Sequence, residues 1–129
     1  MNIKTRIANI VTQANAAQSS FMAGIGKLNG WDAFNASQTA IEKELNDIDK
    51  EAGEGLVVGR SLSFGVADGS ATYIVTKVRK NDVVVAYVPL MDGYQFQGVY
   101  QNSKGELCLP RAVAERQCRM SSGLKSMFA

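Results

Sequence analysis

The chain has 129 residues, of which 46% are apolar and 20% are charged, and its formal net charge at pH 7 is +2. This length suits one domain with one core, and the composition excludes the low hydrophobicity and high charge typical of disordered proteins. Histidine is absent, which excludes catalytic sites with a histidine base and metal sites with histidine ligands. We expect a single domain over residues 1–129, with a helical hairpin at 1–54 and a sheet plus a helix at 55–129.

The first predicted element is a long helix that begins near Ile3 and ends before Gly30. Its apolar residues recur at steps of three and four, as on one face of a helix. They are Ile3, Ile7, Ile10, Ala14, Ala17, Phe21, Ile25 and Leu28. The pair Asn29-Gly30 is typical of a helix end, because glycine adopts the left-handed conformation there at little cost.

A second helix is predicted to begin at Asn29 or Asn35 and to end at Ala52, before Gly53. Asn35 is the favoured cap, because Gln38 follows it by three residues as in a capping box. The apolar face of this helix consists of Phe34, Ile41, Leu45, Ile48 and Ala52. The two helices are expected to form an antiparallel hairpin, joined by a short turn that contains Trp31.

After Gly55 the apolar spacing changes from the helical period to the alternation typical of β-strands. Five strands are expected, at 57–66, 71–79, 83–90, 94–100 and 106–109. Asp-Gly pairs at 68–69 and 92–93 are strong hairpin signals, because the central positions of such turns need positive φ. Strands this closely connected predict an antiparallel meander, and their spacing resembles that of a small SH3-like barrel.

A final helix is predicted after Pro110, because proline suits the first turn of a helix. Its apolar stripe consists of Val113, Met120, Leu124 and Met127. Cys118 falls outside this stripe and is flanked by Arg116 and Arg119, which could lower its pKa and make the thiol reactive. We favour an unreactive thiol, since no resolving cysteine or base accompanies it. Together with Cys108 it makes too few cysteines for a disulfide framework, so reduced thiols are expected.

The sequence predicts a cytoplasmic protein without membrane association. The N-terminal residues include no apolar stretch of the length of a signal peptide, and the longest apolar run, 83–91, is about half as long as a membrane-spanning helix. Glu44, Asp47 and Glu51 share one helical face, which we interpret as a solvated acidic surface and not as a cation site. No metal and no cofactor are expected.

Charge is distributed unevenly along the chain. Residues 1–55 contain five basic and seven acidic side chains, whereas residues 56–129 contain nine and five. Opposite charges on the two helices favour their lying side by side. The basic half is compatible with nucleic-acid binding, although its excess charge is modest for that role.

Aromatic and basic residues near two neighbouring hairpins form the first candidate binding surface. They are Tyr94, Phe96 and Tyr100, with Lys77, Arg79 and Lys80. The three aromatic residues have the same parity in one predicted strand, so their rings would project from one face of the sheet. Such rings beside basic side chains can stack on bases or hold an extended peptide. The alternative is that the rings face the core.

The apolar stripe of the first helix is the second candidate surface, for assembly. Its residues are Ile3, Ile7, Ile10, Ala14, Ala17 and Phe21. The alanines allow close approach of another helix, and the spacing resembles a coiled-coil seam. The stripe packs within its own chain or, in the alternative, joins two chains into a homodimer that pairs or exchanges hairpins.

These features predict a non-enzymatic protein-interaction module, an adaptor or antagonist of another macromolecule, that binds through the sheet and its hairpin tips. A protein partner or self-association is expected. The first alternative is a nucleic-acid-binding protein that uses the basic half, including Arg111, Arg116 and Arg119. The second alternative is a small enzyme that uses a lysine or carboxylate base, for which no residue spacing singles out a catalytic site.

Overall fold

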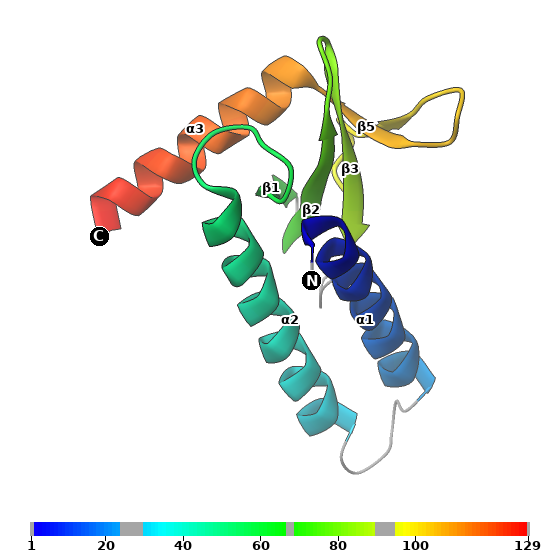
Figure 1. Cartoon of the computed structure of the whole chain (residues 1–129). Coiled ribbons are helices and arrows are strands. Elements are labelled where there is room, and N and C mark those ends of the chain that lie inside the picture. Colours follow the sequence, from blue (N-terminus) through cyan, green and yellow to red (C-terminus); the bar gives the residue numbers. More distant parts are fainter. Residues whose placement is uncertain (1, 24–29, 67–68, 90–94, 129) are drawn as a thin grey trace.

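The structure is a computed structural model that describes the chain at 2–23, 30–66, 69–89 and 95–128, except for the side chains at 20–23, 30–34 and 120–128. Its elements in chain order are α1 (Ile3–Ala23), α2 (Gly30–Ala52), β1 (Ser61–Val66), β2 (Gly69–Val78), β3 (Asp82–Val88), β4 (Tyr100–Gln101), β5 (Leu107–Pro110) and α3 (Arg111–Phe128) (Figure 1). The described residues confirm the predicted α+β fold, with a helical hairpin, an antiparallel sheet and a C-terminal helix.

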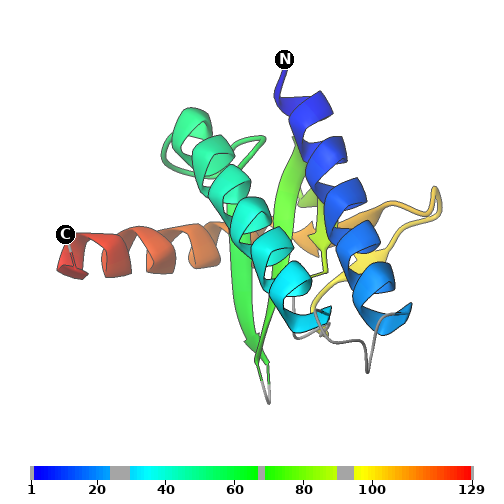
Figure 2. The ribbon, with the colours of Figure 1, turned by 90° about the horizontal axis from the view of Figure 1, so that it is seen from below.

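The elements form layers, with the sheet in the middle. The antiparallel helices α1 and α2 cover one face of the sheet, while α3 crosses the other face (Figures 1 and 2). Alternate residues of β2 contact opposite layers, since Tyr73 and Val75 pack on the α3 side and Ile74 packs under the hairpin. Two cores therefore share one sheet.

Each core joins residues from distant parts of the chain. The core on the α3 side contains Leu62, Phe64, Ala71, Tyr73, Val75, Val83, Val85, Leu109, Ala114 and Cys118. The core on the hairpin side contains Ile7, Ile10, Ala14, Ile41, Leu45, Ile48, Ile74 and Val88. Burial on both faces explains why apolar residues follow one another without alternation at 73–75 of β2 and at 83–88 of β3.

The strand order is β1-β2-β3-β5-β4, and every neighbouring pair is antiparallel. The first three strands form the expected meander, but the last two exchange places, because β3 pairs with β5. The predicted strand at 94–100 is wrong over 95–99, where the chain is irregular and the Val99 N–H donates to the Phe96 carbonyl at 3.2 Å. The sheet is open, with β1 and β4 at its edges, so it does not close into a barrel.

Side chains from both helical layers cover the outer edge of β1. The Ser61 N–H donates to Asp49 Oδ1 of α2 at 2.9 Å, and the Gln117 amide of α3 donates to the Ser63 carbonyl. The opposite edge strand, β4, has only two residues. Occupied edge groups and a short edge strand both discourage pairing with strands of other molecules.

The start of α2 differs from the prediction. The helix begins at Gly30, so Trp31 lies within the helix and not in a turn. Asn35 is not the cap, because a cap residue has non-helical geometry, whereas Asn35 lies more than one turn inside α2. The predicted end of the first helix at Asn29 and the turn residues 68 and 92–93 lie outside the described residues.

A turn at 57–60 delays the start of β1 relative to the predicted strand. The Arg60 N–H closes this turn by donating to the Val57 carbonyl at 3.1 Å, and the Gly59 N–H donates to the Val75 carbonyl at 2.8 Å. Gly59 has a φ of 97°, and a Cβ at this position would lie 3.2 Å from Ala52 Cβ and 3.3 Å from Ile48 Cγ2. The chain therefore needs glycine here for two reasons, the backbone conformation and the close contact with α2.

Substitution of Gly59 with alanine is expected to lower the free energy of unfolding by about 2 kcal/mol, because backbone strain and overpacking add. Gly55 is the matched control, because it has a φ of 86° and a Cβ added to it would meet no atom within 4 Å. Gly55→Ala is expected to cost about 1 kcal/mol, from strain alone. Urea denaturation of both variants measures the difference, and equal losses would show that contact with α2 contributes nothing.

Candidate functional site

The structure brings Arg79 and Tyr100, two of the predicted binding residues, into one polar network that joins the β2–β3 and β4–β5 hairpins. Arg79 Nε and Nη2 donate to Asp82 Oδ1 and Oδ2 at 2.8 and 3.1 Å, and Nη1 donates to Glu106 Oε1 at 3.1 Å. The Tyr100 hydroxyl donates to Asp82 Oδ2 at 3.3 Å, and Asn102 Nδ2 donates to Glu106 Oε1 at 2.8 Å. We call these five residues the Arg79 network.

The pKa values in the Arg79 network reflect these contacts. Hydrogen bonds from Arg79 lower the pKa of Asp82, and hydrogen bonds from Asn102 and then Arg79 lower the pKa of Glu106. The same carboxylates raise the pKa of the Arg79 guanidinium. The charge of Arg79 is therefore matched within the chain, and the network acts as a joint between two hairpins.

The two lysines of this candidate surface are placed differently from Arg79. Lys77 is exposed, with its Nζ 4.0 Å from Glu106 Oε2. Lys80 is also exposed and makes no hydrogen bond or ion pair with other described residues. The surface thus carries carboxylates between its cations, which weakens it as a site for a phosphate backbone.

The Arg79 network is expected to make the stability of the fold decrease as the pH falls into the acid range. Asp82 and Glu106 have lowered pKa values in the folded state, so their contribution is complete above their unfolded pKa values of about 4 and is lost as the pH falls through the folded values. Arg79→Gln is expected to reduce stability at pH 7 and to flatten its decline in acid. Denaturation midpoints from neutral to acid pH measure this, with Lys80→Gln as control; an unchanged acid profile in Arg79→Gln would contradict it.

The aromatic residues do not share one surface. Phe96 stacks on Phe64 with ring centroids 4.2 Å apart, and its N–H donates to the Tyr73 hydroxyl at 2.9 Å. Tyr100 is 42% exposed in the edge strand, and Tyr94 lies outside the described residues. The expected common face is wrong for Phe96 and Tyr100, because 95–99 is not a strand and the parity argument does not apply. For Phe96 the core alternative is confirmed.

The assembly stripe of α1 packs inside the same chain. Ile7, Ile10 and Ala14 are buried in the core under the hairpin, and Ile3 and Ala17 pack against it. The side chain of Phe21 lies outside the described residues. A homodimer that uses this stripe would have to exchange hairpins and so rebuild the same contacts between two chains.

The two helices of the hairpin are also joined by charge. Arg6 Nε donates to Glu44 Oε1 at 2.8 Å, and its Nη1 donates to Glu51 Oε2. These pairs raise the pKa of Arg6, with the hydrogen bond to Glu44 as the largest cause. The acidic face of α2 is thus partly neutralised by α1, as the opposite charges of the helices predict.

Cys118 is a core residue, so the expectation that it lies off the apolar face of the last helix is wrong. It is 4% exposed in the α3 core, and burial raises the pKa of its thiol while the nearby Arg60 lowers it. Cys108 is also buried, and burial raises its pKa as well. Both thiols are free. The neighbours of Cys118 in the sequence, Arg116 and Arg119, are exposed, because neighbouring side chains of a helix point in different directions.

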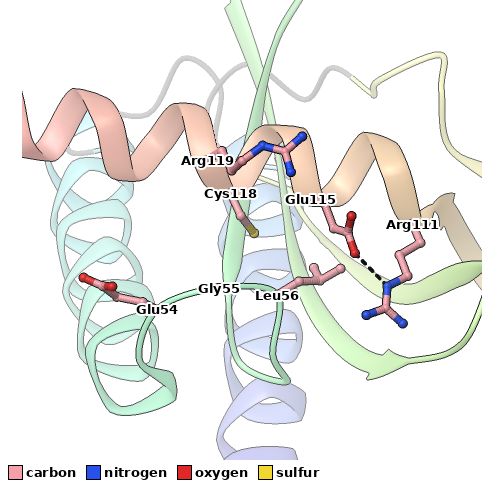
Figure 3. Close-up of a pocket in the computed structure, with 7 residues that line it drawn as sticks. All are labelled: Glu54, Gly55, Leu56, Arg111, Glu115, Cys118 and Arg119. Atoms are coloured by element: carbon pink, nitrogen blue, oxygen red, sulfur yellow. Dashed lines mark hydrogen bonds and ion pairs between the residues drawn. The ribbon is translucent and has the colours of Figure 1, made fainter.

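A pocket of about 480 Å³ lies between α3 and the loop that follows α2, and it opens to solvent (Figure 3). We call it the α3 pocket; its lining residues are Glu54, Gly55, Leu56, Arg111, Glu115, Cys118 and Arg119. Arg111 Nε donates to Glu115 Oε1 at 2.8 Å, and its Nη1 donates to the Arg79 carbonyl at 3.0 Å. Arg111 thereby fixes the first turn of α3 to the end of β2.

Buried Arg60 holds the loop that forms the other wall of the α3 pocket. Its Nη1 donates to the Gly53 carbonyl at 3.2 Å, and its Nε lies 3.6 Å from Asp49 Oδ1 of α2. Gly53 and Gly55 both have a φ of 86°, which lets the chain turn sharply from α2 toward α3. An ion pair and two left-handed glycines therefore shape this wall.

Sequence reasoning missed the α3 pocket as a site. Arg111 and Arg119 were identified only as part of a basic half, and Glu54, Leu56 and Glu115 were not identified at all. One signal was present, since Arg111, Glu115 and Arg119 recur every four residues and so lie on one side of a helix. No local pattern indicates that residues 54–56 lie opposite them.

Among the residues that the structure describes, no three potential metal ligands come together, and no helix combines the length and apolarity needed to cross a membrane. Comparison of the chain with models of protein families, with curated proteins and with solved structures found no match.

Proposed function

We propose that this chain is a non-enzymatic protein-binding module, an adaptor or an antagonist of its partner, that docks the partner at the α3 pocket. The observation that carries the proposal is the pocket itself, with charged walls from α3 and a floor formed by Leu56 and Cys118. Its volume of about 480 Å³ is in the range of pockets that receive a small ligand or a partner's side chains. Arginine beside apolar surface is typical of protein interfaces.

The proposal places recognition at α3 instead of at the sheet and its hairpin tips. Arg79 and Tyr100 both donate hydrogen bonds to Asp82 and so join the two hairpins. Phe96 packs against Phe64 in the core. The edge of β1 is covered by Asp49 and Gln117. The α3 pocket, by contrast, has exposed side chains whose hydrogen-bonding capacity is unused.

The alternatives have less support. Nucleic-acid binding through the hairpin tips would bring phosphates close to Asp82 and Glu106, whose lowered pKa values keep them charged. For an enzyme, the two thiols are the strongest nucleophiles of the chain, and their raised pKa values keep them protonated at neutral pH. The absence of a bond between the two cysteines is compatible with a cytoplasmic location.

Site-specific photocrosslinking in the cells of origin tests the proposal. A photoreactive residue is placed at Ala112, which is exposed on α3 next to the pocket residues, or at Ala40, which is exposed on α2. One protein is expected to crosslink from Ala112 and not from Ala40, and that protein, once purified, is expected to bind the purified chain. The proposal fails if Ala112 gives no protein adduct, or if the adducts from both positions are the same.

A further inference from the structure

Cys118 is the only nucleophile among the described residues that line the α3 pocket. Its thiol points toward Gly55 on the opposite wall (Figure 3). A Cβ added to Gly55 would meet no atom within 4 Å, so there is free space beside this glycine. The pocket opens to solvent, and its volume of about 480 Å³ is in the range of pockets that admit a small molecule. A small reagent therefore has a route to the Cys118 sulfur.

Buried Arg60 places a positive charge near the Cys118 thiol. Burial raises the pKa of this thiol, whereas the charge of Arg60 and a hydrogen bond from its side chain lower it. The Arg60 side chain is only 5% exposed, and its Nε has no hydrogen-bond partner among the described residues. The guanidinium thus has donor capacity left, and a buried donor without an acceptor is costly. Arg60 therefore favours the thiolate of Cys118, which is the reactive form of cysteine.

Cys108 is buried in a similar way but has no such access. It is 0% exposed and is not among the residues that line the α3 pocket. Burial raises the pKa of its thiol, and the charge of the nearby Asp82 raises it further. The chain thus contains two thiols that differ in access to solvent through a pocket, and Cys108 is an internal reference for Cys118.

The other charged residues that line the α3 pocket are of both signs, with two arginines and two glutamates, Glu54, Arg111, Glu115 and Arg119. Arg111 and Glu115 bond to each other at 2.8 Å. Arg119 and Glu54 are exposed and make no ion pair with other described residues. They lie on opposite walls, so the lining can accept a carboxylate on one side and an ammonium group on the other. A small ligand that carries both groups fits such a lining better than a ligand of one charge.

We propose that Cys118 is a site of thiol modification, where the α3 pocket admits a low-molecular-weight disulfide of the glutathione class and the chain forms a mixed disulfide with it. The Cys118 thiol loses its proton to solvent, and its sulfur attacks one sulfur of the reagent. The S–S bond of the reagent breaks, a new S–S bond to Cys118 Sγ forms, and the other half leaves as a thiolate. Cys118 is thereby oxidised and the departing half is reduced. Each half of oxidised glutathione carries carboxylates and an ammonium group, as the lining requires.

The reaction needs no partner protein, so it stands or fails independently of the proposed function. A mixed disulfide on Cys118 would occupy the space in which the partner is proposed to dock. Oxidation of Cys118 would then block docking, and reduction would restore it. This consequence alone rests on the proposed function.

The test treats the purified, reduced chain with oxidised glutathione at pH 8, and peptide mass spectrometry follows each cysteine over time. Under native conditions Cys118 is expected to gain the adduct about tenfold faster than Cys108 or more, because Cys108 reacts only when the fold opens. In urea the two thiols are expected to react at similar rates, which shows that both adducts are detected. The proposal is overturned if Cys118 gains no adduct under native conditions, or if Cys108 reacts there as fast as Cys118.

Two charge reversals on α3 test whether the reagent enters through the α3 pocket. Arg119 lines the pocket, whereas Arg116 is exposed on the same helix and does not line it. Both variants change the net charge equally. The rate at Cys118 is measured with oxidised glutathione, which is net negative, and with dithiodipyridine, a neutral disulfide. Arg119→Glu is expected to lower the ratio of these two rates about threefold more than Arg116→Glu does, because the charge next to the entering reagent matters most. Equal ratios in the two variants overturn entry through the pocket.

Discussion

Replacement of Ile10 with alanine is expected to lower the free energy of unfolding by about 2 to 5 kcal/mol, because it removes buried apolar contacts and leaves a cavity. Ile10 is 1% exposed. It lies in the core between the hairpin and the sheet, together with Ile41 of α2 and Ile74 of β2. The substitution therefore weakens the contact of α1 with both of its neighbours. Urea denaturation followed by circular dichroism measures the loss.

The same experiment distinguishes packing within one chain from a seam between chains. If the stripe packs within its own chain, the loss in Ile10→Ala is independent of protein concentration. Gln13→Ala, on the exposed face of α1, is the control and is expected to leave stability nearly unchanged. If wild-type stability rises with protein concentration and Ile10→Ala abolishes that rise, the stripe joins two chains, and packing within a single chain is contradicted.

Asp49→Asn is expected to lower the free energy of unfolding by about 3 to 5 kcal/mol, because it leaves a buried charge without its counter-ion. The side chains of Arg60 and Asp49 are only 5% and 12% exposed, and Arg60 Nε has no hydrogen bond. Asparagine retains an oxygen that can accept the Ser61 N–H, so the substitution removes the charge and can keep this hydrogen bond. Urea denaturation at neutral pH measures the effect.

The control for Asp49→Asn is Glu51→Gln, which removes a carboxylate from an exposed ion pair on the same helix. Glu51 is 57% exposed, and exposed pairs contribute little because water screens them. Asp49→Asn is therefore expected to cost far more than Glu51→Gln. Equal losses would show that the Arg60–Asp49 pair is solvated and does not hold the pocket loop.

The buried pair also connects stability with the proposed docking site. Arg60 bonds the Gly53 carbonyl at 3.2 Å, and the next three residues, 54–56, line the α3 pocket. Loss of the Asp49 charge frees Arg60 to move and so loosens this wall. Partner binding is expected to weaken in Asp49→Asn even under conditions where the variant stays folded.

The candidate site was less predictable than the fold because its residues are brought together by long-range contacts. The spacing of Arg111, Glu115 and Arg119 places them on one side of a helix, and the sequence alone shows this. Whether that side faces solvent, the sheet or residues 54–56 depends on how α3 crosses the sheet. The burial of Cys118 has the same origin, since its position relative to Val113 and Met120 did not indicate which face of the helix is covered.

Local patterns in the sequence determined the helical hairpin, the strands of the first meander and the C-terminal helix, because apolar periodicity and glycine turns reflect backbone geometry over a few residues. The tertiary structure alone decided the strand order, since pairing β3 with β5 instead of β4 is a choice between long-range contacts. It also decided the position of Phe96, which does not lie in a strand as predicted and whose ring stacks on that of Phe64. The α3 pocket is likewise decided by the tertiary structure alone, because its two walls are far apart in the chain and meet only when both cores have formed around the sheet.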